Sequence, residues 1–93
     1  KAFEWYEKAA SQGLAEAQFS LGFMYYDRIG VKKDIKKAIE CFEKAASQGF
    51  ADAQYILGIM YDVGEGVKKD IKKAKKVFKE ACNGGHQDSC KLI

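Results

Sequence analysis

Two cysteines and the only histidine of the chain lie near its end at a spacing that could do chemistry. Cys82, His86 and Cys90 follow one another at intervals of four residues, and Asp88 lies between the last two. The two thiols could form a disulfide, could be small buried side chains in a reducing cytosol, or could bind a metal. Aligning metal ligands at this spacing needs one continuous helix, and Gly84-Gly85 breaks that helix. We therefore expect no metal site, and the first two alternatives stay open.

Catalysis by a Ser-His-Asp or Cys-His-Asn arrangement would have to be built around His86, because no other histidine is present. Nothing earlier in the sequence indicates its partners. Gly64-Glu65-Gly66 lacks the preceding strand that a nucleotide-binding loop requires, and we interpret it as a connection between two helices. The pattern thus predicts a protein that is not an enzyme and holds no cofactor.

Lysines form the other concentrated group, on two segments that repeat each other: Lys32, Lys33, Lys36 and Lys37, and then Lys68, Lys69, Lys72, Lys73, Lys75, Lys76 and Lys79. Such a group is typical of proteins that bind phosphate backbones or anionic membranes. The same segments also carry carboxylates such as Glu43 and Glu80, however, and the net charge of the whole chain is only +3. No aromatic residues interleave with the lysines for base stacking. We expect a solvated convex face, with no nucleic-acid partner and no membrane insertion.

The length and composition of the chain limit what these residues can belong to. Its 93 residues are 47% hydrophobic and 31% charged, which is typical of one globular domain. A chain this short buries only somewhat more than half of its unfolded surface, so a deep catalytic pocket is not expected. No run approaches the roughly eighteen apolar residues needed to cross a bilayer. Because Lys1 lies within a helical pattern, we expect the chain to be part of a longer protein.

The elements that carry these residues repeat along the chain. The run Ala9-Ala10-Ser11-Gln12-Gly13 recurs at residues 45–49, and Gly30-Val31-Lys32-Lys33-Asp34-Ile35 recurs at residues 66–71. The offset is 36 residues in both cases, and residues 1–36 match residues 37–72 at 24 positions. Residues 37–57 match residues 73–93 at only 6 of 21 positions. A period of this length without strand-like alternation predicts a stacked array of repeats.

Each repeat is expected to be a pair of helices, because its apolar residues recur at helical spacing. The expected helices cover residues 1–12, 15–27, 34–48, 51–63 and 70–83, with a short one from about residue 87. The whole chain then forms a single all-α domain. Its expected units are the second helix of a partial repeat, two full repeats, and the start of a further repeat or a C-terminal cap, at residues 1–13, 14–49, 50–85 and 86–93.

Capping residues and internal glycines agree with this period. Asp34 and Asp70 are the expected N-caps of second helices. The left-handed residues expected after the second helices are Gly13, Gly49 and Gly85. Gly22 and Gly58 lie inside first helices, where glycine is unfavourable, so we expect each of them to allow a close contact with another helix.

Several stretches resemble Sel1-like repeats, which are longer relatives of the tetratricopeptide repeat. The first copy contains Ala15-Glu16-Ala17-Gln18-Phe19-Ser20-Leu21-Gly22-Phe23-Met24-Tyr25, the loop ending Gly30-Val31-Lys32-Lys33-Asp34, and the stretch from Ala38 to Gly49. The second copy contains the stretch from Ala53 to Tyr61 and Gly64-Glu65-Gly66-Val67. The resemblance covers essentially the whole chain. Asp27-Arg28-Ile29 departs from the usual glycine-rich loop, and Lys32 and Lys68 stand where many members carry proline. The resemblance implies a right-handed superhelical α-solenoid of antiparallel helix pairs. Its concave face, lined by the first helix of each pair, would bind a protein or peptide.

The cysteine spacing is similar to that of the secreted cysteine-rich subgroup of bacterial Sel1-like proteins. This resemblance implies a disulfide between Cys82 and Cys90 and a periplasmic or secreted protein, with a cytoplasmic protein as the alternative. It also implies an alternative function, that of a penicillin-binding or β-lactamase-like protein. No serine is followed three residues later by lysine, so the Ser-x-x-Lys nucleophile motif of that class is absent. Cys41 is expected to be a buried, inert free thiol.

In a tetratricopeptide-like pair, Leu21, Gly22 and Tyr25 point into the stack, and the opposite side of each first helix faces the groove. The groove residues expected from the two copies are Glu16, Phe19, Ser20, Phe23, Tyr26 and Asp27, and then Asp52, Tyr55, Ile56, Ile59, Asp62 and Val63. Both sets mix apolar side chains with carboxylates, which suits an extended or helical segment with apolar anchors and basic flanks. In the alternative interpretation, Phe19, Phe23, Tyr55 and Ile59 only pack within the repeats.

Overall fold

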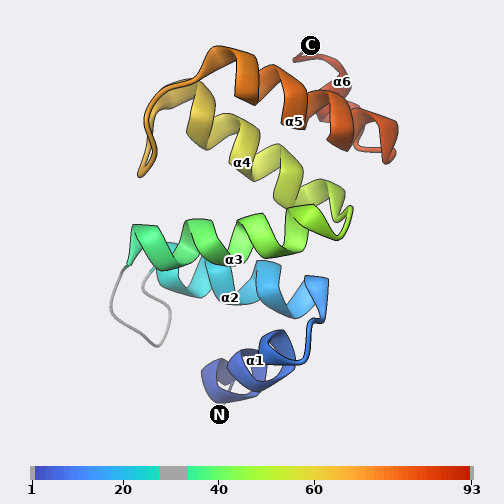
Figure 1. Cartoon of the computed structure of the whole chain (residues 1–93). Coiled ribbons are helices and arrows are strands. Elements are labelled where there is room, and N and C mark those ends of the chain that lie inside the picture. Colours follow the sequence, from blue (N-terminus) through green and yellow to red (C-terminus); the bar gives the residue numbers. More distant parts are fainter. Residues whose placement is uncertain (1, 28–33, 93) are drawn as a thin grey trace.

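The computed structural model of the chain describes residues 2–27 and 34–92, which fold into six α-helices and contain no β-strand (Figure 1). The helices are α1 (Ala2–Ser11), α2 (Ala15–Asp27), α3 (Ile35–Ser47), α4 (Ala51–Val63), α5 (Ile71–Asn83) and α6 (Gln87–Cys90). Each predicted helix is present with ends that agree within one residue, so the all-α fold class is confirmed. The predicted loop residues 28–33 lie outside the described residues, as do the side chains of residues 1–3 and Asp27.

The second helices α3 and α5 begin at aspartate N-caps. Asp34 Oδ1 accepts a hydrogen bond from the Lys37 N–H at 3.1 Å, and Asp70 Oδ1 accepts one from the Lys73 N–H at 3.0 Å. After the second helices, φ angles of +86°, +83° and +96° occur at Gly13, Gly49 and Gly85. Residues with a Cβ atom rarely adopt such angles. Both kinds of predicted capping residue are confirmed, and they fix where each repeat turns.

Gly22 of α2 and Gly58 of α4 let each first helix approach the second helix of its own repeat. A Cβ atom at Gly22 would lie 2.7 Å from Phe42 Cε1, and one at Gly58 would lie even closer to Phe78 Cε1. Such distances are too short for real Cβ atoms, so any larger residue would push the ring away. The predicted close helix contact is confirmed, and it offsets the unfavourable helix propensity of glycine at these positions.

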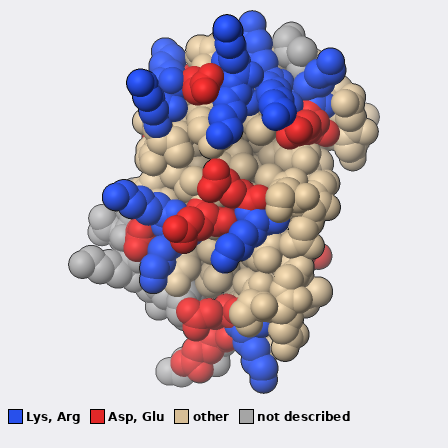
Figure 2. Space-filling view, in the orientation of Figure 1, with Lys and Arg blue, Asp and Glu red and all other residues tan. Residues whose placement is uncertain are grey.

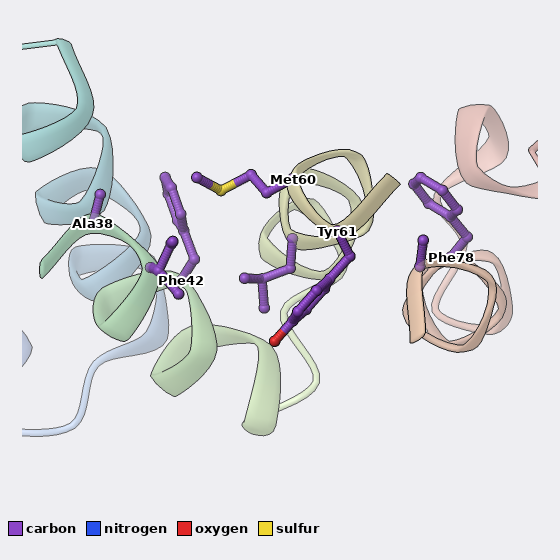
Figure 3. Close-up of a cluster of buried hydrophobic side chains, with 8 residues drawn as sticks. Ala38, Phe42, Met60, Tyr61 and Phe78 are labelled. Atoms are coloured by element: carbon purple, nitrogen blue, oxygen red, sulfur yellow. The ribbon is translucent and has the colours of Figure 1, made fainter. Parts of the chain in front are cut away.

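The core is a continuous apolar layer that runs through successive helices. Phe42 of α3 and Met60 of α4 point toward each other, and Phe78 of α5 lies on the other side of α4 (Figure 3). The other buried members of this cluster are Ala38, Ile39, Leu57, Tyr61 and Ala74. Because α4 packs against both α3 and α5, each repeat buries its apolar face on its neighbours, as expected for a stacked array.

Candidate functional site

A hollow of about 100 Å³ lies where α2, α3 and α4 meet. Its lining combines apolar side chains with one tyrosine and one carboxylate: Phe23, Tyr26, Phe42, Ile56, Ile59, Met60 and Glu65. We call it the α2–α4 hollow, because it takes residues from two successive first helices. A side chain bound there would contact two repeats at once, which a single helix pair could not provide.

A hydrogen-bonded pair connects the two repeats at this hollow. The Tyr26 hydroxyl donates to the Glu65 carboxylate, at 2.9 Å from Oε1 and 3.1 Å from Oε2. Glu65 is half-buried and lies in the Gly64-Glu65-Gly66 turn that follows α4. A Cβ atom at Gly66 would clash with Ile35 of α3, so this turn lies directly on the preceding repeat. The close packing holds the Glu65 carboxylate against the hollow.

Four of the predicted groove residues line this hollow, namely Phe23, Tyr26, Ile56 and Ile59. Sequence reasoning missed the other three. Phe42 and Met60 belong to the buried faces of their helices, and Glu65 belongs to a turn, so none of them lies on the groove-facing stripe of a first helix. The two glycines that flank Glu65 are the signal that could have found it, because they indicate a close backbone approach.

Phe19 and Tyr55, which are also predicted groove residues, pack against other rings. The Phe19 ring centroid lies 4.9 Å from that of Phe23 and 5.2 Å from that of Phe50. Tyr55 stacks on His86 with ring centroids 4.4 Å apart. Both residues are half-buried, so these packing contacts leave part of each ring at the surface.

Five further predicted groove residues do not line the hollow: Glu16, Ser20, Asp52, Asp62 and Val63. Ser20 is half-buried, and the side chain of Asp27, the last predicted groove residue, lies outside the described residues. The other four are exposed, and Val63 is among the most exposed large hydrophobic residues at 61%. Glu16 instead lines a separate hollow together with Trp5 and Leu14, and Asp52 lies beside His86.

The structure gives His86 two partners that the sequence did not indicate. His86 Nδ1 accepts a hydrogen bond from the Ser89 N–H at 3.2 Å and lies 2.9 Å from Ser89 Oγ. His86 Nε2 lies 3.5 Å from Asp52 Oδ1. These are the residue types of a catalytic triad, but Ser89 is 0% exposed, and a nucleophile must reach its substrate. We interpret the group as an N-cap that attaches α6 to α4.

Cys82 and Cys90 are joined in a disulfide with their Cα atoms 4.8 Å apart, as the cysteine-rich resemblance implies. The bond links the end of α5 to α6. Its sulfurs are bonded to each other and so offer no thiolate to a metal. Within residues 2–27 and 34–92, no three His, Cys, Asp or Glu side chains are grouped as metal ligands.

Cys41 is half-buried, so the expectation of a buried thiol is wrong in this respect. Its small side chain does not fill the space between α1, α2 and α3, and it lines a hollow of about 190 Å³ there together with Glu7, Gln18 and Lys44. Partial burial nevertheless raises the pKa of the Cys41 thiol. A raised pKa leaves less thiolate at neutral pH, and the thiolate is the reactive form.

The lysines gather over the α5 end of the molecule, with aspartate and glutamate side chains among them (Figure 2). All the lysines of α5 are exposed. Lys73 Nζ lies 4.7 Å from the centroid of the Tyr61 ring, and a hydrogen bond to the Tyr61 hydroxyl raises the pKa of Lys73. No helix in the described part of the chain is long and apolar enough to span a membrane.

The family model of the Sel1 repeat matches residues 1–14, 15–50 and 51–86. Among solved structures, a Sel1 repeat protein from Oxalobacter formigenes is 42% identical with a TM-score of 0.91, and it aligns with 94% of this chain and 36% of its own. Helicobacter pylori cysteine-rich protein B is 34% identical with a TM-score of 0.94, and it aligns with 98% of this chain and 68% of its own.

A protective antigen of uropathogenic Escherichia coli that displays an SLR fold is 36% identical with a TM-score of 0.90. It aligns with 94% of this chain and 19% of its own. The chain therefore spans only a minor part of the Oxalobacter and Escherichia proteins. No curated protein matches the chain.

Proposed function

The chain belongs to the Sel1 repeat family, and from that premise we propose that it is a non-enzymatic scaffold that binds a protein or peptide on the concave face formed by α2 and α4. Sel1 repeat proteins are typically protein-interaction scaffolds. The α2–α4 hollow is the observation that carries the proposal. Phe23, Ile56 and Ile59 offer half-buried apolar surface there, and side chains in such pockets dominate binding energy in protein interfaces.

We propose that the other groove residues predicted from the sequence also belong to the interface: Glu16, Phe19, Ser20, Asp27, Asp52, Tyr55, Asp62 and Val63. Exposed aromatic and aliphatic side chains with a polar rim are typical of peptide-binding surfaces. Trp5 and Leu14 are also exposed, at 63% and 54%, and they line a separate hollow between α1 and the start of α2, together with Glu16.

The disulfide supports a location in an oxidising compartment, and we propose that the protein is periplasmic or secreted. A disulfide persists where thiols are not kept reduced. The similarity to a cysteine-rich bacterial protein agrees with this placement. Penicillin hydrolysis has no support from the described residues, because the one histidine-centred group has a fully buried serine.

Selection from a random peptide library displayed on phage tests the proposal. The bait is the disulfide-intact protein, and each enriched clone is then measured against Ile59→Asp, which places a charge in the hollow. The matched control is Lys75→Asp on the exposed face of α5. We expect clones that lose most of their binding to Ile59→Asp and keep it for Lys75→Asp, with no turnover of a chromogenic β-lactam.

Phe23→Asp is the second variant, and circular dichroism with thermal unfolding checks that both variants fold. Clones that bind all the variants equally, or no enriched clones at all, would contradict binding at the hollow. Steady β-lactam turnover that depends on one side chain would replace the scaffold with an enzyme.

A further inference from the structure

We infer that the segment bound in the α2–α4 hollow combines an aliphatic anchor with a lysine or arginine beside it. This inference rests on the proposed function and goes further by stating the chemistry of the partner. It follows from the size of the hollow, from the distribution of charge between first and second helices, and from the position of Glu65.

The size of the hollow favours an aliphatic anchor. An apolar cavity of about 150 Å³ is large enough for benzene, and the α2–α4 hollow measures about 100 Å³. A leucine, isoleucine or valine side chain therefore fits better than an aromatic ring. The side chains of Phe23, Ile56 and Ile59 that line the hollow are apolar, so they pack well against an aliphatic side chain.

Within the described helices, the lysines are confined to one of the two layers, whereas carboxylates lie in both. The first helices α2 and α4 contain carboxylates and no lysine or arginine. Every lysine that lies within a described helix lies in α1, α3 or α5. The face that offers the hollow is therefore acidic, and complementarity of charge favours a basic partner.

Part of this acidity has a purely structural explanation. Glu16 and Asp52 lie in the first turns of their helices, where the helix dipole stabilises a negative charge. Asp62 lies in the last turn of α4, which has no basic residue, and Glu65 follows soon after. Helix stability does not explain these two carboxylates, because the C-terminal end of a helix already carries a partial negative charge.

Glu65 is the carboxylate best placed to bind a cation at the hollow. Among the described residues, its two oxygens share one donor, the Tyr26 hydroxyl, and each oxygen of a carboxylate can accept more than one hydrogen bond. Among the described residues, no lysine or arginine forms an ion pair with Glu65. A partner cation there would pair with a carboxylate that is already oriented and partly desolvated, which favours a charge-assisted hydrogen bond.

The sequences of the Ile59-dependent phage clones test the inference separately from the proposed function. We expect these clones to be enriched in lysine or arginine next to leucine, isoleucine or valine, relative to the unselected library. The most enriched sequence is then made as a fluorescein-labelled peptide for anisotropy. The affinity of the protein for this peptide should fall about tenfold with Glu65→Gln, because a charged hydrogen bond is lost. It should fall less than twofold with Glu40→Gln, on the exposed face of α3.

Glu65→Gln keeps an oxygen for the Tyr26 hydroxyl, so the turn should retain its structure. Ile59-dependent clones of neutral or acidic sequence would overturn the inference and leave the proposed function standing. An affinity unchanged by Glu65→Gln would also overturn it. A dimer in sedimentation that Ile59→Asp converts to a monomer would assign the hollow to a second copy of the chain and overturn it as well. If no clone depends on Ile59, the proposed function fails, and the inference fails with it.

Discussion

The junction between α3 and α4 and the junction between α5 and α6 occupy equivalent places 36 residues apart, yet different chemistry holds them. In the first, Gln54 Nε2 donates to the Ala46 carbonyl at 3.2 Å. In the second, the same two positions are Cys90 and Cys82, joined covalently. Gln18 and Ala10 hold the junction of α1 and α2 in the same way as Gln54 and Ala46, with a hydrogen bond of 3.2 Å.

The two kinds of connection also differ in strength. A hydrogen bond contributes about 1 kcal/mol to the free energy of unfolding. A disulfide that closes a loop of this length contributes about 2–3 kcal/mol, because it restricts the unfolded chain. The junction between α5 and α6 is therefore held more strongly than the junction between α3 and α4.

The two glutamines also differ in how well their hydrogen bonds are satisfied. Gln18 Oε1 accepts a hydrogen bond from Gln48 Nε2 at 2.8 Å. The position equivalent to Gln48 one repeat later is Gly84, which has no side chain. Gln54 Oε1 is consequently buried without a hydrogen-bond partner among the described residues. Repeats of similar sequence thus differ in this hydrogen bond through a single substitution at a helix end.

Removing the disulfide should have the largest effect. We expect the double variant Cys82→Ala and Cys90→Ala to lose about 2–3 kcal/mol of unfolding free energy in urea, because the unfolded chain regains the entropy of the closed loop. Hydrogen exchange should show lost protection in α6 and retained protection in α3 and α4. Cys41→Ala is the control, and an equal loss in that variant would contradict the assignment.

Adding a second disulfide one repeat earlier should stabilise the protein. The double variant Ala46→Cys and Gln54→Cys should form a second disulfide, because the equivalent residues 36 positions later, Cys82 and Cys90, are joined in one. The expected gain is about 1–2 kcal/mol, which is the loop entropy minus about 1 kcal/mol for the lost hydrogen bond. Intact mass after alkylation counts the thiols, and urea unfolding gives the free energy. Free thiols in the folded variant would show that the two junctions differ in backbone geometry.

Gln48→Gly should reproduce the unsatisfied glutamine of the later repeat. Gln18 Oε1 would lose its donor, and an unpaired buried acceptor costs about 1–3 kcal/mol. Gln12→Gly is a matched control, because Gln12 occupies the equivalent position and its side chain makes no hydrogen bond to the described residues. The difference in unfolding free energy between the two variants measures the hydrogen bond. Equal losses would mean that only the backbone effect of glycine is seen.

Gly84→Gln should have a smaller effect of the opposite sign. Gly84 has φ −84°, close to the −91° of Gln48, and a Cβ atom there meets its nearest neighbour at an ordinary 3.5 Å. The new amide can donate to Gln54 Oε1, and we expect a gain of about 1 kcal/mol in urea unfolding. Gly84→Ala separates the backbone contribution from that of the amide. A gain no larger than that of the alanine variant would contradict the hydrogen bond.

The smallest expected effect is a slower alkylation of Cys41 in the folded protein. Cys41 takes part in neither junction. Because burial raises its pKa, the folded protein has less thiolate than the unfolded chain at pH 8, and iodoacetamide should react with it several-fold more slowly. The gap should close as the pH rises past the raised pKa, where both states are thiolate. Mass spectrometry in the presence and absence of urea gives the two rates, and faster reaction in the folded state would contradict the direction of the shift.

Local patterns carry enough information to predict the helices, the aspartate N-caps and the close approach at Gly22 and Gly58, because each depends on residues within one repeat. The α2–α4 hollow was predicted only in part. Glu65 reaches it through a turn that packs on the preceding repeat, and helical periodicity does not report such a contact. The contact between His86 and Asp52 was missed for the same reason, since Asp52 comes from another helix.

The most direct test of binding at the α2–α4 hollow is an NMR titration of the 15N-labelled protein with the most enriched library peptide. If the peptide binds in the hollow, the largest amide shift changes should cluster around Phe23, Tyr26, Ile56, Ile59 and Glu65. Residues 71–83 of α5 should then remain unchanged. Changes centred on the lysines of α5, with none at the hollow, would contradict the proposal and place the binding surface on the opposite layer of the solenoid.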